Sequence, residues 1–276
     1  MARPPTDIVR FGHVANPFSR PIEVALERGY FADEGVELEV TRFANGTGTA
    51  DALAAGEIDI GVGGHIQTLQ ATLAGSPQVF IAPLGFEQSP NHLVIALVAG
   101  AGVTSGRDLE RVTVGVSARA AISELQLRIF MAAEGAEPDS LTLSPMPFSE
   151  LGAALARGEI GAASAPDPLA SQLAEAGLGR VIDRGSLSRA LPPGEWVMIT
   201  GLATTPSWVD HDPARARAIV KAVGRAVDDL DGAAKPNTPR FDRVLRPIDL
   251  QRVFDLALEH GLVDRAASAR DLIRSL

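Results

Sequence analysis

Apolar residues recur along the chain with two spacings, one typical of strands and the other of helices. Residues 36–40 (Val-Glu-Leu-Glu-Val) alternate apolar and charged side chains, the period of two that marks a half-buried strand. Residues 21–29 have apolar side chains at helical spacing after Pro21, a residue that suits a first helical turn. We expect further strands at residues 8–12, 58–62, 79–84, 93–98, 112–116, 141–143, 160–163 and 196–202, and further helices at 50–55, 123–134, 149–156, 214–230, 247–260 and 266–273.

A long repeat divides this pattern into two similar halves. Residues 53–61 are similar to residues 155–163, and residues 32–38 are similar to residues 132–138, about one hundred residues later in each case. Alternating strands and helices favour parallel sheets with helices on both faces, so the repeat predicts two doubly wound α/β lobes joined by a hinge. We expect the first lobe at residues 1–97 plus 200–276, the second at 98–199, and the crossings near 96–102 and 196–203.

Two facing α/β lobes form a cleft at the carboxyl ends of their strands, where small molecules bind. The loops at these ends are rich in Gly, Ser, Thr and Asn, so backbone N–H groups can approach a ligand. Where such loops open helices, the free N–H groups and the helix dipole favour an anionic group. The loops that qualify are residues 12–20, 43–49, 63–67, 117–123 and 164–168.

Several side chains in these loops have both a binding and a structural interpretation. His65 follows two glycines at a strand end and could bind a ligand or be an ordinary loop histidine. Arg119 could make a paired contact with a carboxylate or sulfonate, or lie on the surface beside a helix start. Asp167, between two prolines, could meet a cationic or hydroxylated ligand or simply begin a helix. Ser123 is expected to cap the helix that follows it, with Gln126 completing the capping box.

The remaining candidates are hydroxyl, amide and aromatic side chains. Asn45 is expected in an Asn-Gly turn, and Thr47 offers a hydroxyl group to the cleft. Phe18, Phe86 and Trp196 could form apolar walls of the cleft or belong to the core.

Composition and charge exclude several classes of function. The 276 residues carry a net charge of −9, which argues against a surface for nucleic acid or anionic membranes. The chain has no cysteine, so disulfides, thiolate metal sites and cysteine nucleophiles are excluded. The histidines lack metal-ligand spacing, and no apolar run reaches the length of a membrane span. Neither a metal nor another cofactor is expected.

Three segments resemble one family of binding proteins. Residues 25–38, with Gly29-Tyr30-Phe31 followed by acidic residues, a glycine and a strand, are similar to the solute-binding proteins of sulfonate, nitrate and taurine ABC importers. Residues 51–61 match the next helix and strand of that family, and residues 107–116 resemble its entry into the second lobe. The resemblance implies a type 2 periplasmic-binding-protein fold with a small-molecule cleft.

The same fold is also used by enzymes, among them a thiamine-pyrimidine synthase, a desulfinase and a decarboxylase. The desulfinase has a nucleophilic cysteine in the loop after the first strand, where this chain places Asn16. The synthase uses a lysine and a histidine-rich iron site, neither of which is apparent here. An enzyme of this kind remains the alternative, and it would then rely on Asn16, His65, His92 and Arg119.

The sequence therefore predicts a solute-binding protein that captures a small organic or oxyanionic ligand by hinge closure and delivers it to an ABC permease. We expect a monomer that neither binds nucleic acid nor inserts into a membrane. A cytoplasmic lyase or biosynthetic enzyme is the alternative. No signal peptide is visible from Met1 onward, so we expect the periplasm or cell envelope if a signal has been removed, and the cytoplasm if Met1 is the native start. The expected ligand contacts are Asn16, Phe18, Asn45, Thr47 and His65 in the first lobe, Ser117, Arg119 and Asp167 in the second, and Trp196 near the hinge.

Overall fold

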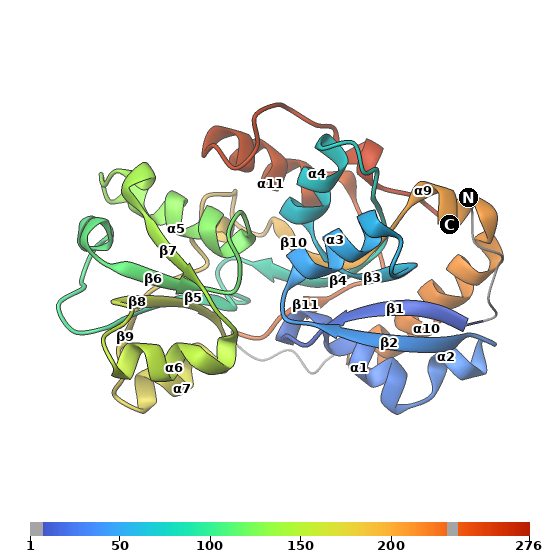
Figure 1. The fold of residues 1–276 in the computed structure, drawn as a ribbon, viewed down its shortest axis with the longest axis horizontal. Helices are drawn as coiled ribbons and strands as arrows, with labels where there is room; N and C mark the ends of the chain where they lie inside the picture. Colours follow the sequence, from blue (N-terminus) through green and yellow to red (C-terminus); the bar gives the residue numbers. More distant parts are fainter. Residues whose placement is uncertain (1–7, 231–236) are drawn as a thin grey trace.

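The computed structural model describes residues 8–230 and 237–276 and has two α/β lobes side by side (Figure 1). The first lobe is built on a six-stranded sheet in the order β11-β4-β10-β3-β1-β2. Its strands are β1 (Ile8–Val14), β2 (Glu37–Phe43), β3 (Ile60–Gly64), β4 (Val79–Gln88), β10 (Trp196–Thr204) and β11 (Arg240–Phe241).

The second lobe has a five-stranded sheet in the order β7-β6-β8-β5-β9. This order matches that of the first sheet, with β6, β7 and β8 in the places of β1, β2 and β3. The repeat seen in the sequence is therefore a repeat of topology. The strands are β5 (Ile95–Ala99), β6 (Thr113–Val116), β7 (Thr142–Pro145), β8 (Ala162–Pro166) and β9 (Arg180–Arg184).

The sheets are mixed, whereas the sequence pattern favoured parallel ones. In each lobe three strands are parallel: β1 pairs with β2 and β3, and β6 with β7 and β8. The strand next to each parallel set runs the other way, β10 against β3 and β5 against β8. Both of these strands enter their sheet directly from the other lobe, without a crossover helix that would return them in the parallel direction.

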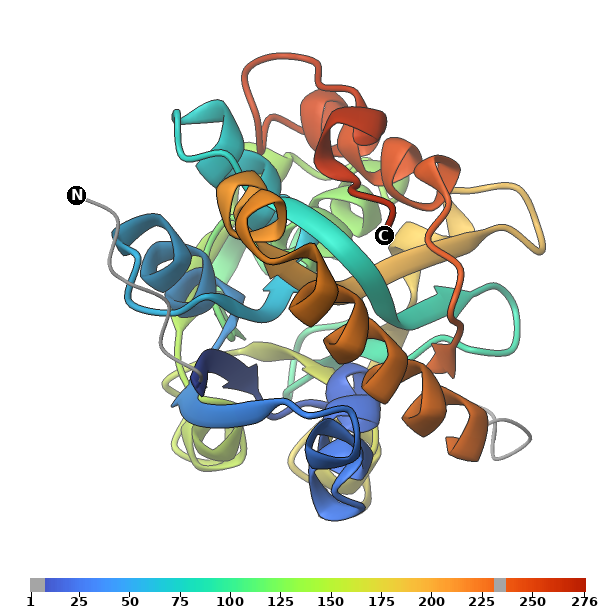
Figure 2. The ribbon, with the colours of Figure 1, turned by 90° about the vertical axis from the view of Figure 1, so that its right-hand side faces the viewer.

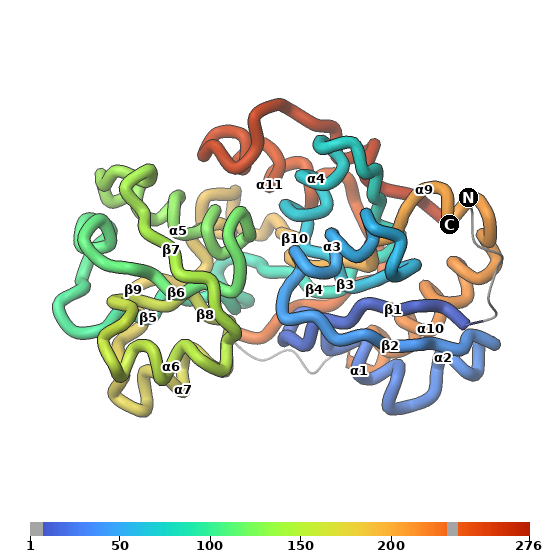
Figure 3. The backbone as a smooth tube through the Cα atoms, in the orientation of Figure 1, coloured from blue at the N-terminus to red at the C-terminus, as the bar shows by residue number. Residues whose placement is uncertain are grey.

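The chain passes between the sheets at residues 89–94 and 190–195 (Figure 3). The crossings expected near residues 96–102 and 196–203 overlap β5 and β10, so the passages lie several residues earlier. The passages contain turn residues, Ser89-Pro90-Asn91 in the first and Pro192-Pro193-Gly194 in the second, which mark them off from the buried strands that follow. The division into domains at residues 97–98 and 199–200 stays a prediction.

Helices cover both faces of each sheet. On the first sheet, α1, α2 and α10 pack on one face and α3, α4 and α11 on the other, and Figure 2 shows α10 running along the first lobe. On the second sheet, α5 covers one face and α6 and α7 the other. The main helices are α1 (Arg20–Glu27), α2 (Tyr30–Asp33), α3 (Gly46–Ala55), α4 (His65–Leu73), α5 (Ile122–Ala133), α6 (Phe148–Ala156), α7 (Leu169–Glu175), α8 (Ser186–Arg189), α9 (Pro206–His211), α10 (Pro213–Leu230) and α11 (Pro247–Glu259).

Strand β5 shows why the core strands are apolar throughout. Leu97 and Ala99 face the cluster under α5, while Ala96 and Val98 face the cluster under α6 and α7. A strand covered on both faces has no solvent side, so its sequence shows no alternation.

Two helices differ from the expected pattern. The helix expected at residues 50–55 begins four residues earlier, since Asn45 caps it. The helix expected at 266–273 is only a short 3-10 turn, Ala269–Leu272, after which Ile273 pairs with Phe80 of β4. This bridge draws the last residues against the sheet instead of continuing the helix.

Gly85 of β4 allows the loop after β1 to lie against the sheet. A methyl group at Gly85 would stand 2.7 Å from the carbonyl oxygen of Phe18 and 2.8 Å from its Cα. We expect Gly85→Ala to lower the free energy of unfolding by about 1–3 kcal/mol, the usual effect of overpacking, in urea denaturation.

Gly152→Ala is the matched control for this prediction. Gly152 lies within α6, and its added methyl would meet only side-chain ends, Leu173 Cδ2 at 3.0 Å and Leu178 Cδ1 at 3.6 Å. Alanine favours a helix interior by roughly 0.5–1 kcal/mol, so this variant should be as stable as the parent or more so. Equal stability of Gly85→Ala and the parent would contradict the close approach of Phe18.

Candidate functional site

A pocket of about 740 Å³, partly open to solvent, lies between the two sheets. It is formed where the parallel strands of both lobes end, and Val14, Gly64 and Pro166 bring three of those strand ends to it. A cleft between two lobes at strand ends is a common position for small-molecule sites. The residues that line it are Val14, Asn16, Phe18, Ala44, Asn45, Gly46, Val62, Gly64, His65, Gln67, Ile199 and Thr200 from the first lobe, with Ile95, Ser117, Ala121, Ile122, Ser123, Phe148, Ser164 and Pro166 from the second.

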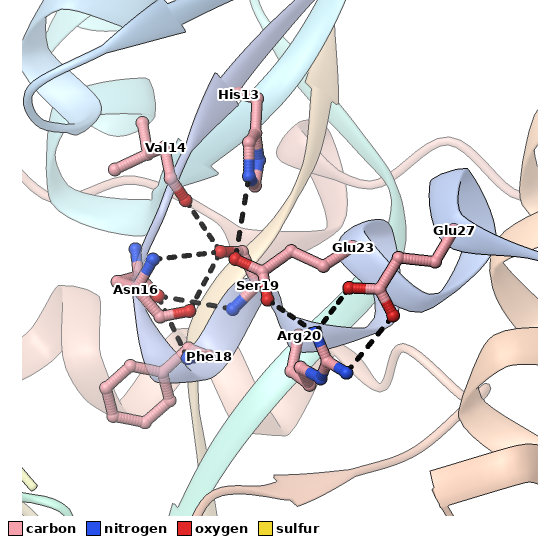
Figure 4. A network of polar contacts seen from close by, with 8 residues as sticks. All are labelled: His13, Val14, Asn16, Phe18, Ser19, Arg20, Glu23 and Glu27. Carbon is pink, nitrogen blue, oxygen red and sulfur yellow. Dashed lines mark hydrogen bonds and ion pairs between the residues drawn. The ribbon is translucent and has the colours of Figure 1, made fainter. Parts of the chain in front are cut away.

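The loop after β1 is held by a network of short polar contacts (Figure 4). The side chain of Asn16 accepts hydrogen bonds from the backbone N–H of Phe18 at 2.9 Å and of Ser19 at 3.2 Å. The buried Ser19 hydroxyl lies 2.6 Å from the carbonyl oxygen of Val14 and accepts the Asn16 N–H at 3.2 Å. These bonds fix the turn and place Asn16 and Phe18 on the pocket wall. His13, on the same strand, instead faces Glu23 of α1 at 3.8 Å (Figure 4).

One hydrogen bond joins the lobes across the mouth of the pocket. The Asn45 side chain uses its oxygen to accept the Gly48 N–H at 3.1 Å, which caps α3. Its amide Nδ2 donates to the carbonyl oxygen of Ser117 in the second lobe at 3.0 Å. A single side chain therefore both begins a helix and bridges the two lobes.

Four helices begin at the pocket wall. Gly46 of α3, His65 of α4, Ile122 of α5 and Phe148 of α6 all line the pocket. The helices α5 and α6 have no side-chain cap, so the first backbone N–H groups of these helices keep their donor capacity, whereas in α4 the Ile66 N–H donates to His65 Nδ1. Ser123 was expected to cap α5, but this is wrong. The helix starts one residue before it, and the Ser123 hydroxyl is buried in the first turn without a hydrogen-bond partner among the described residues.

His65 is completely buried at the start of α4. Its Nδ1 accepts the backbone N–H of Ile66 at 2.9 Å, while its Nε2 has no hydrogen-bond partner in the described part of the chain. Burial lowers the pKa of His65 to about 3. The ring is therefore neutral at physiological pH, and because Nδ1 is an acceptor, the proton lies on Nε2. His65 therefore lies on the pocket wall with one uncharged N–H donor that has no partner among the described residues.

Among the described residues that line the pocket there is no Asp, Glu, Lys or Arg. Because His65 is neutral as well, the described part of the wall carries no formal charge. Its electrostatic character comes from N–H dipoles, the amides of Asn16, Asn45 and Gln67, and hydroxyl groups.

The structure brings together five of the predicted site residues, Asn16, Phe18, Asn45, His65 and Ser117, on the pocket wall. Thr47 lies in the first turn of α3 outside the lining, with its hydroxyl buried and unpartnered among the described residues. Arg119 is exposed and donates to the carbonyl oxygen of Leu143 on β7 at 2.7 Å.

The other two predicted site residues also lie outside the lining. Asp167 forms an ion pair with Arg184 and accepts two hydrogen bonds from Ser171, so its carboxylate is occupied. Trp196 packs edge-on against Phe86 with ring centroids 5.4 Å apart, and Arg240 stacks over it at 4.2 Å.

Sequence reasoning missed several lining residues, and one signal could have found Phe148. The repeat matches α3 with α6, so the first residue of α6 corresponds to Gly46 at the pocket wall. Gln67 and Ser164 lie in loops expected at the cleft, but their residue types do not distinguish them there, and Ile95 and Thr200 gave no signal because each lies in a buried strand.

Comparison with known proteins agrees with the fold and the sequence motifs. The model of the NMT1-like family matches residues 2–240. The chain belongs to the NMT1-like family. Members of a family share a fold more reliably than a ligand, so the pocket must be interpreted from its own residues.

Among solved structures, this NMT1-like protein is similar to an alkanesulfonate-binding protein, SsuA from Xanthomonas axonopodis pv. citri bound to MOPS. The TM-score is 0.79 with 16% identity, over 98% of this chain and 99% of that one. It is also similar to the periplasmic aliphatic sulphonate binding protein SsuA from Escherichia coli, with a TM-score of 0.71 and 19% identity over 98% and 92% of the two chains. At this identity the likeness establishes the fold, which confirms the two-lobed periplasmic-binding-protein architecture expected from the sequence.

A curated relative gives a shorter match. A 4-amino-5-hydroxymethyl-2-methylpyrimidine phosphate synthase from Legionella pneumophila is 28% identical over 100 residues, 36% of this chain. The match spans only about a third of that enzyme's length, 31%.

Two further properties concern the described residues of this protein. None of their helices has the length and apolar character of a membrane span, and they contain no group of three or more potential metal-ligating side chains.

We predict that the His65 ring stays neutral, with the proton on Nε2, throughout the range from pH 5 to 8. Burial disfavours the charged ring, so the pKa in the folded chain lies far below the ordinary value of 6.5. The stability that His65 contributes is present above 6.5 and is lost as the pH falls toward about 3.

Long-range ¹H–¹⁵N correlation spectra of the ¹⁵N-labelled protein measure this directly, and His65→Asn assigns the signal. The two ring nitrogens should keep the separate shifts of a neutral imidazole. A titration of this ring between pH 5 and 8 would contradict the buried position.

Proposed function

We propose that this protein is a solute-binding protein for a compact organic molecule with an apolar body and one hydrogen-bond-accepting head group, either neutral or singly anionic. The observation that carries the proposal is the uncharged pocket between the lobes, with the Nε2–H of His65, which has no partner among the described residues, and the uncapped starts of α5 and α6 on its wall. A carboxylate or sulfonate of one negative charge fits these donors, because N–H dipoles at helix N-termini stabilise an anion without a cationic side chain.

The apolar part of the wall supports the organic character of the ligand. Phe18 and Phe148 come from opposite lobes, and Val14, Val62 and Ile199 add aliphatic surface. A small inorganic oxyanion would leave this surface without a partner, while an alkyl or aryl group would remove it from water at roughly 25 cal/mol per Å².

Two features argue against other ligand charges. A cation would find no carboxylate in the lining and no cage of aromatic rings. A phosphate dianion would be desolvated beside a ring that cannot accept a proton in the neutral range.

Binding would act by population shift between open and closed lobes. The pocket is shared by the two sheets, so a ligand in contact with His65 and with the start of α5 favours the closed arrangement over the open one. The Asn45–Ser117 hydrogen bond forms only where the lobes are near each other, and it adds to the same preference. We propose an ABC permease as the partner that receives the ligand, and the periplasm or cell envelope as its location.

An enzyme is the second candidate, favoured by the partial match to the pyrimidine phosphate synthase. The chemistry of the pocket supports it less. His65 is a weak base with a pKa near 3, and His92 lies outside the pocket, with Nδ1 3.1 Å from the carbonyl oxygen of Thr238. Lys221 forms an ion pair with Glu34 at 2.7 Å away from the pocket, and Lys235 lies outside the described residues. The described pocket thus has no side chain poised for general acid–base or Schiff-base catalysis.

We expect organic monoanions to stabilise the protein in a thermal-shift panel of alkyl and aryl sulfonates, carboxylates, nitrate, phosphate esters and amines. A ligand at roughly 100 times its Kd adds about 2.7 kcal/mol to stability, a shift of several degrees. The compound should be recovered unchanged, as mass spectrometry of the mixture will show. Stabilisation by phosphate esters or amines alone would overturn the charge assignment, and consumption of the compound would favour the enzyme.

Two variants separate His65 from Arg119 as the residue that binds the head group. His65→Leu removes the buried donor and should raise the Kd of the best sulfonate or carboxylate by about 10- to 100-fold, the effect of one lost hydrogen bond in a dry site. Arg119→Ala is the control, since Arg119 is exposed and donates to Leu143. It should change the Kd less than about twofold. Isothermal titration calorimetry measures both, and a larger loss in Arg119→Ala would contradict the assignment.

A further inference from the structure

A buried carboxylate lies at the junction of the two passages between the lobes. Glu87 is the second-last residue of β4 and belongs to the first lobe. Its side chain has no exposed surface, although the chain leaves the first lobe only two residues later. The ligand pocket does not use it.

Glu87 is hydrogen-bonded to both passages. Its Oε1 accepts the backbone N–H groups of Val94 at 2.7 Å and Ile95 at 2.6 Å, where the first passage enters β5. Its Oε2 accepts the hydroxyl group of Ser188 at 3.0 Å, in α8 just before the second passage. We call these four residues the hinge clamp. All three donors belong to the far end of a passage or to the second lobe, so a rotation of that lobe moves them relative to Glu87.

An apolar cluster seals the hinge clamp from water. Val94, Leu187 and Leu191 from the passages and α8 pack with Val197 of β10 and Val253 of α11. The cluster includes residues of both lobes, so opening the lobes at this junction would separate its members and admit water to Glu87.

The charged groups around Glu87 are each paired with another residue. Arg184 on β9 acts on Glu87 through its charge but is itself ion-paired with Asp167. Asp183 is paired with Arg189 on α8, and Glu195 of the second passage lies 3.6 Å from Arg252 of α11. Among the described residues, His92 lies within the first passage, and Arg240 and Arg246 stack on Trp196, whose ring packs on Phe86.

We propose that Glu87 is a proton-controlled latch: with its carboxyl group protonated the hinge clamp stays closed, and with the group ionised the lobes open. The physical reason is that an ionised carboxylate gains more from water than a neutral one, so ionisation favours the arrangement in which the junction is hydrated. This coupling goes beyond the proposed function, because it concerns the hinge and needs no ligand.

The pH range of the switch follows from the buried position. Burial raises the pKa of Glu87 from its ordinary value of 4.5 to about 7, against the opposing effect of its three hydrogen-bond donors and Arg184. The stabilisation that protonated Glu87 gives to the closed form is therefore complete below 4.5 and lost as the pH rises through about 7. The closed arrangement is favoured at pH 6 and the open one at pH 8.

Trp196 reports on this junction. It begins β10 directly after the second passage, and its ring packs on Phe86, the neighbour of Glu87. Trp208 is the other tryptophan of the chain, so Trp208→Phe leaves Trp196 as the single reporter. In the ligand-free Trp208→Phe protein, Trp196 fluorescence and the radius of gyration, the latter from X-ray scattering, are measured from pH 5.5 to 8.5. We expect a red-shifted emission and a larger radius at high pH, with a midpoint near neutrality.

Glu87→Gln is the matched variant, since it mimics the neutral carboxyl group and leaves His92 in place. It should remain closed across the range, and its melting temperature should exceed that of the parent increasingly from pH 5.5 to 8.5. The same pH response in Glu87→Gln and the parent would overturn the proposal, and so would the absence of any response in the parent. These outcomes leave the ligand experiments unaffected.

A second variant keeps the proposal testable if Glu87→Gln fails to fold. Ser188→Ala removes one hydrogen bond that holds the closed arrangement, so the lobes should open at a lower pH than in the parent. An unchanged midpoint, or one moved to higher pH, would show that the hinge clamp does not control the opening.

Discussion

A polar group buried away from water must find a hydrogen-bond partner, and between the two lobes this requirement is met in one place and left open in another. At the hinge, the carboxyl group of Glu87 has three hydrogen-bond partners from the second lobe and the passages into it. In the pocket, the Nε2 of His65 and the hydroxyl group of Ser123 have no partner among the described residues. The first arrangement joins the lobes, by our proposal as long as Glu87 is protonated, and the second leaves a defined place for an outside acceptor. The closed arrangement of the two lobes depends on the satisfied group at the hinge, and ligand binding in the pocket depends on the unsatisfied ones.

The repeat of topology explains why the open donors gather in one place. Each lobe has three parallel strands, and two of the three are followed by a helix whose first residue lines the pocket, α3 and α4 in the first lobe and α5 and α6 in the second. Because the free N–H groups point along the helix axis, both halves of the repeat aim donors at the same space. The wall can therefore favour an anionic head group without a charged side chain. Arg119 is not needed there and instead donates to the carbonyl oxygen of Leu143 on β7.

The sequence was sufficient for the architecture and for part of the site. Repeated helix–strand units and the Gly29-Tyr30-Phe31 motif indicated the two lobes, and loop position placed Asn16, Asn45 and His65 at the pocket, since strand ends are visible in a sequence. Contacts between residues far apart in the chain cannot be seen in a sequence. Asp167 and Arg119 have polar side chains in the expected loops, yet the fold supplies Arg184 and the Leu143 carbonyl as their partners. Glu87 gave no signal, because a carboxylate at a strand end has the same appearance whether it is exposed or buried.

The most direct test is a crystal structure of the protein with the sulfonate or carboxylate that stabilises it most. We expect a head-group oxygen within hydrogen-bond distance of His65 Nε2, the organic group between Phe18 and Phe148, and no contact with Arg119. A head group paired with Arg119, or a compound bound outside the pocket between the lobes, would contradict this expectation.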